Sequence, residues 1–194
     1  RISPLGIWGA RRPAAEVADA ARLDARLTHP HPVCQDASAL FAVTLAAAIG
    51  RRLDRQATYA FALEWGRAEK LQPTVMQAVE AAAIEPPRDF MSTQGWVLIA
   101  LQNAFFQLTH ASTLESGVVA TVRAGGDTDT NAAICGALLG AVHGRAAIPT
   151  QWQRMVVTCR PMVGQPDVTQ PRPAIYWPVD VLVMAERLLD HKDD

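Results

Sequence analysis

The hydrophobic residues of this chain recur mainly every three or four positions, which is the period of an amphipathic α-helix. Residues 13–26 follow this period, begin with a proline and stop before Pro30, so they predict a helix with proline in its first turn. The next period predicts a helix that extends from Asp36, as its N-cap, to Leu53. Two alanine-rich segments, separated by Pro73, predict further helices: 57–70 and 74–83.

The second half of the chain continues the helical pattern. Residues 95–108 are apolar on nearly every face, which is typical of a helix in the protein interior. Residues 114–124 are rich in β-branched side chains and fit a helix or a strand, but the i, i+4 spacing of Leu114, Val118 and Val122 favours a helix. Three more helices are expected in the remainder: 130–143, 149–160 and 179–189. Small residues throughout 130–143 predict that neighbouring helices approach it closely.

These patterns predict an all-α protein with one domain over residues 1–194, a length that can bury a substantial core. The composition is 49% hydrophobic and 19% charged, with a formal net charge of −1. The lack of a basic excess argues against a direct nucleic-acid partner. The longest apolar run, 37–50, stops at two arginines and is shorter than the roughly 20 residues that span a bilayer, so no membrane partner is expected.

The three cysteines are odd in number and share no Cys-x-x-Cys spacing, which argues against a disulfide framework or a structural zinc site. We therefore expect a reducing, cytoplasmic location. His29, His31 and Cys34 could form part of a zinc site, but no fourth ligand lies nearby in the sequence, and a proline-stiffened turn between helices is the alternative.

The strongest chemical signal is the segment Gly-Gly-Asp-Thr-Asp-Thr at residues 125–130, directly before a predicted helix. It places two carboxylates and two hydroxyls within four residues, and such hard oxygen ligands suit Mg²⁺ or Mn²⁺. Asp and Thr are also common helix caps, so capping is the competing interpretation. A calcium-binding EF-hand does not fit, because Ala132 and Leu138 occupy its glycine and glutamate positions.

This segment and its continuation, Asn-Ala-Ala-Ile-Cys-Gly-Ala-Leu-Leu-Gly-Ala, resemble the C-terminal signature of the ADP-ribosylglycohydrolase family, typified by dinitrogenase-reductase-activating glycohydrolase. Four other stretches agree with the family in order: 1–7, 27–34, 95–97 and 148–152. The resemblance implies a compact orthogonal bundle of helices with two Mg²⁺ or Mn²⁺ ions at the base of an ADP-ribose cleft. It implies metal ligation by Asp127, Asp129 and Thr130.

The resemblance also implies the reaction and its partners. Family members cleave the bond at ribose C1″ and release ADP-ribose from a modified protein or another acceptor. The family's glutamate and further metal ligands lie in an N-terminal half, whereas this chain starts with Arg1, at a position that follows the family's glycine-rich substrate loop. We therefore expect that half outside this chain, as a possible partner of it, and assign no catalytic residue.

Four residues are expected to bind substrate by resemblance. His29 would lie near the diphosphate and Gly95 and Trp96 near the adenine or distal ribose, and Gly126 is also assigned to substrate binding. The alternatives are a turn role for His29 and a core position for Trp96. A second functional hypothesis also stays open, in which the chain is a non-catalytic ADP-ribose-binding or protein-interaction module.

Overall fold

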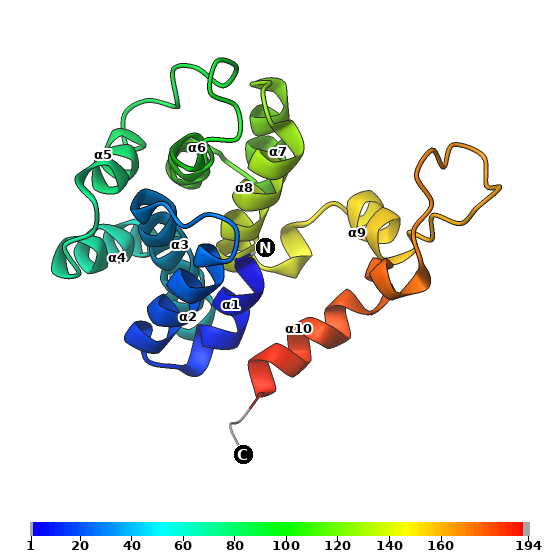
Figure 1. Cartoon of the computed structure of the whole chain (residues 1–194), viewed down its shortest axis with the longest axis horizontal. Coiled ribbons are helices and arrows are strands. Elements are labelled where there is room, and N and C mark those ends of the chain that lie inside the picture. The colour runs from blue at the N-terminus through cyan, green and yellow to red at the C-terminus, as the bar shows by residue number, and fades with distance from the viewer. Residues whose placement is uncertain (1, 192–194) are drawn as a thin grey trace.

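The structure is a computed structural model that describes residues 2–191. Within that range it contains ten α-helices, short 3₁₀ turns and no strand, which confirms the all-α prediction (Figure 1). The helices are α1 Ser3–Trp8, α2 Ala14–Arg26, α3 Pro32–Arg51, α4 Arg55–Ala68, α5 Pro73–Ala81, α6 Val97–His110, α7 Leu114–Arg123, α8 Thr128–His143, α9 Thr150–Val157 and α10 Val181–Asp190.

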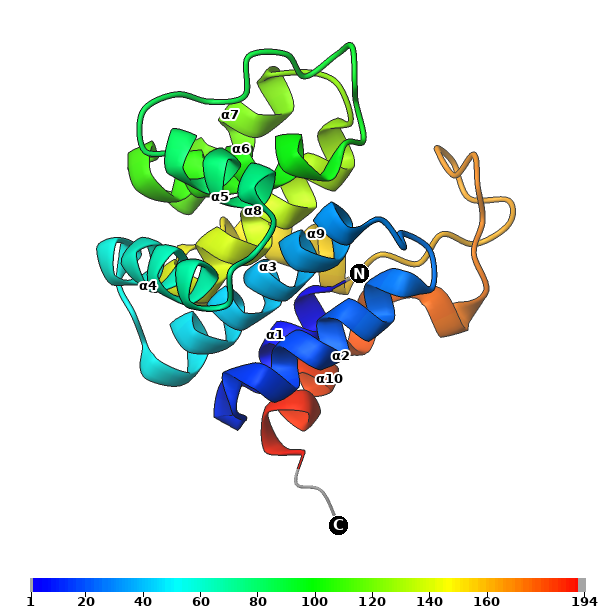
Figure 2. The same ribbon diagram turned by 60° about the vertical axis from the view of Figure 1, so that its left-hand side comes forward.

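The 20-residue helix α3 is the central element: α1 and α2 pack on one side, and α4, α6 and α8 contact it elsewhere (Figure 2). Its length and composition would allow it to cross a membrane, but 72% of its most apolar window is buried within the protein, as in the core helix of a globular fold. The expected start at Asp36 is wrong. His31 is the N-cap, and Asp36 instead accepts hydrogen bonds from the Arg22 guanidinium and the Gln72 backbone N–H.

Two clusters of buried side chains form the core. The larger one joins α3, α6 and α8, where Leu40, Phe105 and Leu138 are fully buried. The smaller one joins α2 and α3 through alanines and valines such as Val17 and Ala42, and these small side chains allow the two helices to lie close together. Helix α8 is thereby fixed by the main core over its length, so its N-terminal turn has a rigid support.

The ambiguous segment after residue 113 is a helix, α7, begun by a capping box in which Thr113 and Ser116 each accept a hydrogen bond from the other's backbone N–H. The prediction that neighbouring helices approach α8 closely is wrong at two of its glycines. A Cβ at Gly136 would make only an ordinary contact with Val118, and a Cβ at Gly140 would meet nothing within 4 Å.

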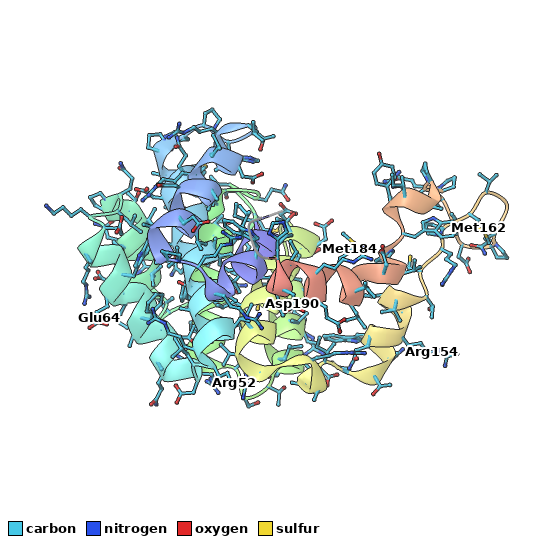
Figure 3. The ribbon with its side chains drawn as sticks, turned by 90° about the horizontal axis from the view of Figure 1, so that it is seen from below. Arg52, Glu64, Arg154, Met162, Met184 and Asp190 are labelled. Atoms are coloured by element: carbon cyan, nitrogen blue, oxygen red, sulfur yellow. The ribbon has the colours of Figure 1, made fainter. Side chains whose placement is uncertain are left out.

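The last two helices belong to a C-terminal arm, in which the described residues beyond 149 include none that is buried. Figure 3 shows this arm from below, with Met162 at its far end and Glu64 and Arg52 on the main body. Helix α10 returns from the arm to α1, and Asp190 pairs with Arg11 at 3.2 Å. An apolar groove of about 530 Å³ separates the arm from α7 and α8.

The loop between α5 and α6 and the short turn between α7 and α8 meet at one end of the molecule, as Figures 1 and 2 both show. The turn carries the Gly-Gly-Asp-Thr-Asp-Thr segment, and the loop carries Gly95 and Trp96. Helix α6 begins at Val97, two residues after the expected start, so Gly95 and Trp96 belong to the loop end rather than to the helix.

Candidate metal centre

The turn that opens α8 depends on two consecutive glycines. Gly125 has φ +83° and Gly126 has φ +69°, a left-handed region that side chains other than glycine rarely adopt. A Cβ at Gly126 would also overlap the Phe90 carbonyl oxygen, because the α5–α6 loop lies directly against the turn. The turn can therefore form this tight junction only with glycine at residue 126.

The aspartates of the turn are not used as helix caps in the expected way. Asp127 occupies the N-cap position of α8, but its side chain makes no capping hydrogen bond. Asp129 Oδ1 accepts the Thr130 backbone N–H at 2.9 Å. Hydrogen bonding from the Asp127 carboxyl group, followed by that of the Thr130 N–H, lowers the pKa of Asp129. The two carboxyl groups are thus neighbours at the start of α8.

These side chains border an open depression with a volume of about 520 Å³. Its lining combines the glycine turn with the end of the α5–α6 loop: Gln94, Gly95, Gly126, Asp127, Thr128 and Asp129. Gly95, at φ +83°, lies so close to the turn that a Cβ there would be 3.8 Å from Asp127 Oδ2. Four of the seven predicted site residues therefore meet in one place, and Thr130 follows them on the first turn of α8.

Trp96 borders an adjoining depression of about 490 Å³ that shares Gln94 and Gly95 with the first. Its side chain is not a core residue, since 38% of it is exposed. The imidazole of His31 contacts the indole edge to face, with ring centroids 5.9 Å apart and an interplanar angle of 76°. An exposed aromatic face at the rim of a cleft can stack on a planar ring of a ligand.

His29 is not brought to this site by any described contact. Its Nδ1 lies 2.7 Å from Thr28 Oγ1, its side chain is exposed, and it lines neither depression. His31, two residues later, accepts the Val33 N–H through Nδ1 while its ring contacts Trp96. The sequence pattern His-Pro-His-Pro flags both histidines, and only the folded chain distinguishes which one reaches the indole.

The donor set of the turn fits a divalent cation in kind. Asp127, Asp129 and Thr130 offer two carboxylates and a hydroxyl, the hard oxygens that Mg²⁺ and Mn²⁺ prefer. It does not fit two ions in number, because among residues 2–191 no third His, Cys, Asp or Glu side chain joins such a cluster. Two octahedral ions require about twelve ligands, so these residues can hold at most part of a two-ion centre.

Sequence reasoning missed several neighbours of the turn. Asn131 is only 2% exposed, and its amide nitrogen has no hydrogen-bond partner among the described atoms. Met91 accepts the Gly126 N–H through its sulfur at 3.1 Å, and Gln94 lines both depressions. Asn131 follows the recognised motif directly and could have been flagged, whereas the loop residues lie some 35 positions away and carry no sequence signal.

The chain is similar to known proteins in sequence and in fold. The family model for ADP-ribosylglycohydrolase matches residues 1–189. A solved structure titled ADP-ribosylglycohydrolase-related protein complex is similar, with a TM-score of 0.68 and 30% sequence identity over 77% of this chain. The chain spans about half of that structure, since the match covers 50% of its length. No curated protein matches the chain.

Proposed function

This chain belongs to the ADP-ribosylglycohydrolase family, and we propose that it provides part of the active site of a metal-dependent hydrolase that removes ADP-ribose from a modified protein or other acceptor. The bond broken is the one at ribose C1″. The observation that carries the proposal is the meeting of Asp127, Asp129, Gly95 and Gly126 around one depression at the N-terminus of α8. A family match over almost the whole chain supports the same reaction class.

The proposed ligands are the carboxylates of Asp127 and Asp129 and the hydroxyl of Thr130. A bound Mg²⁺ or Mn²⁺ supplies positive charge that holds ribose hydroxyls and makes a nearby water more acidic. The described donors are too few for two ions, so we assign no step to a second one. We assign no general acid or base, because the family's glutamate is expected in the N-terminal half and not among the residues of this turn.

The other proposed contacts concern the substrate. Gly95 has no side chain, so a ribose can approach its backbone beside Asp127 closely, whereas the space where a Cβ of Gly126 would stand is filled by the Phe90 carbonyl. Trp96 offers an indole face at the adjoining depression, where the adenine or distal ribose would stack. His29, assigned to the diphosphate by resemblance, would need to turn away from Thr28 to take part. The ADP-ribosylated acceptor itself stays open.

The test is loss of cation binding together with loss of turnover. In the complete protein, extended upstream of Arg1, Asp127→Asn and Asp129→Asn should abolish release of ADP-ribose from an ADP-ribosylated protein in Mn²⁺ buffer, because an amide is a far weaker ligand than a carboxylate. Asp167→Asn, a change of one carboxylate in an exposed loop of the C-terminal arm, serves as the control and should leave turnover unchanged. Full turnover in both site variants would refute the assignment.

A second candidate function follows from the incomplete donor set. Because no third acidic or imidazole side chain accompanies the two aspartates among the described residues, the chain could bind ADP-ribose, or a partner protein, without hydrolysis. Calorimetric titration of Mn²⁺ and of ADP-ribose separates the two candidates, applied to this chain and to a version extended upstream of Arg1. ADP-ribose binding without Mn²⁺ binding or turnover in either version would favour the module.

We also propose a reducing, cytoplasmic location. Cys34, Cys135 and Cys159 are all free thiols, and two of them are buried. Burial raises the pKa of Cys135 to about 11, which keeps this thiol protonated and chemically inert at neutral pH.

A further inference from the structure

The loop between α5 and α6 contains a carboxylate that organises the segment lying on the glycine turn. Asp89 Oδ1 accepts the backbone N–H groups of Met91 at 2.8 Å and Ser92 at 3.0 Å. These two bonds fix the chain direction from residue 89 to residue 92 in a tight turn. The Ser92 hydroxyl, together with these N–H groups, lowers the pKa of Asp89, so its ionised form is the stable acceptor at neutral pH.

The ordered segment contacts the glycine turn at two points. Met91 Sδ accepts the Gly126 N–H at 3.1 Å, and a Cβ on Gly125 would lie 3.3 Å from the same sulfur. The Phe90 carbonyl oxygen occupies the space that a side chain at Gly126 would need. Met91 itself is 62% exposed, so this contact lies at the surface of the protein.

The same loop returns to the aspartates at its other end. Gly95 borders Asp127 and shares the depression with Asp129. The backbone that orients both carboxylates is therefore held between α8 on one side and the loop organised by Asp89 on the other. Asp89 lines neither depression, so it contacts neither a ligand there nor a cation on the aspartates.

We propose that Asp89 is a positioning residue for the aspartate turn: through Met91 and Phe90 it holds Gly126, and hence Asp127 and Asp129, in the arrangement that binds a divalent cation. The cation part of this inference rests on the proposed function. The structural part, in which the loop organised by Asp89 holds the Gly126 amide in place, does not depend on the proposed function.

The test uses four variants. Asp89→Ala removes both hydrogen bonds, whereas Asp89→Asn keeps an oxygen acceptor of the same shape and should behave as wild type. Met91→Leu keeps the volume but removes the sulfur acceptor. Glu85→Gln is the matched control, since Glu85 lies in the same loop and its carboxylate pairs with Arg88 rather than with the turn.

Two measurements are made on each variant, after circular dichroism has verified the helical fold. Without metal, the Gly126 amide should exchange with solvent about threefold or more faster in Asp89→Ala and Met91→Leu, because a hydrogen bond of modest strength is lost or loosened. With Mn²⁺, calorimetry should give a cation affinity about threefold to tenfold weaker in Asp89→Ala, with recovery in Asp89→Asn.

Each outcome decides the proposal. Unchanged Gly126 exchange in Asp89→Ala overturns it, as does an Asn variant that is as impaired as the Ala variant, or unaltered Mn²⁺ affinity in Asp89→Ala. If neither the wild-type chain nor the version extended upstream of Arg1 binds Mn²⁺, the proposed function fails, while the exchange data alone still accept or reject the positioning role.

Discussion

His31 and Trp96 contact each other edge to face, with ring centroids 5.9 Å apart, although 65 positions separate them in the sequence. His31 lies at the start of α3 and Trp96 directly before α6, so the contact links the N-terminal ends of two core helices. The same imidazole accepts the Val33 N–H as the N-cap of α3. One side chain thus begins a helix and supports the indole at the rim of the candidate substrate site.

The two roles of His31 can be separated by substitution. His31→Asn keeps an N-cap acceptor, so its free energy of unfolding should stay near that of wild type, whereas His31→Ala should lose about 1 kcal/mol. Both variants lose the ring contact and should bind ADP-ribose about twofold to tenfold more weakly, because the indole is no longer held. Urea denaturation and calorimetric titration measure the two effects.

A double-mutant cycle checks that the loss of affinity passes through Trp96. Trp96→Leu alone should weaken ADP-ribose binding, and adding His31→Asn to it should weaken binding no further. Additive losses from the two substitutions would mean that His31 acts on the ligand by another route.

The glycine turn gives a prediction about stability. Gly126→Ala should destabilise the protein by about 2–4 kcal/mol, because it combines a positive φ with overlap against a backbone carbonyl of the facing loop. Gly144 at the other end of α8 has a similar φ of +76° but nothing within 4 Å of an added Cβ. Gly144→Ala would carry backbone strain alone, about 1–3 kcal/mol at φ +76° and ψ 169°, and should therefore cost less than Gly126→Ala. Equal losses in urea denaturation would contradict the overlap.

The helices were predictable because their apolar residues repeat with the helical period over ten or more positions. Helix α1 was missed, since six residues with a proline and a glycine carry too short a period to detect. The start of α3 was placed at Asp36 because aspartate is a favoured cap. The actual cap is His31, where the chain turns after two prolines, and Asp36 is used to join α2 and α5 instead.

The part of the candidate site that lies within one local sequence motif was predictable. Asp127, Asp129 and the paired glycines are adjacent in sequence, so their chemistry could be recognised without a fold. Their contacts with Phe90 and Met91 depend on how the α5–α6 loop crosses the molecule. No periodicity or spacing encodes such a contact, because it arises from tertiary packing of two irregular segments.

A buried polar pair between α6 and α7 gives a further prediction. Asn103 Nδ2 donates to Thr121 Oγ1 at 2.9 Å, and both side chains are at most 1% exposed. Thr121→Val would leave the Asn103 amide without this partner and should cost about 1–3 kcal/mol of unfolding free energy.

Thr44→Val is the matched control for that substitution. Thr44 is also fully buried, but its hydroxyl donates only to the Leu40 carbonyl of its own helix, so its loss leaves no buried donor unpaired and should cost less than about 1 kcal/mol. Thermal or urea denaturation measures both. A larger loss for Thr44→Val would show that the pair between α6 and α7 adds little.

The last prediction concerns pH. Burial, and then the positive charge of Arg55, lower the pKa of His143 below its ordinary 6.5, and its Nε2 is buried without a hydrogen-bond partner among the described residues. The unfolded chain therefore binds a proton more readily than the folded chain. The stability that neutral His143 confers is fully present above pH 6.5 and is lost as the pH falls through the folded-state pKa.

The wild-type unfolding midpoint should fall as the pH decreases from 7 to 5, and less so in His143→Gln. Asp54 and His110 line a cavity together with His143 and are unchanged in that variant, so an identical slope in both proteins would assign the pH dependence to groups other than His143.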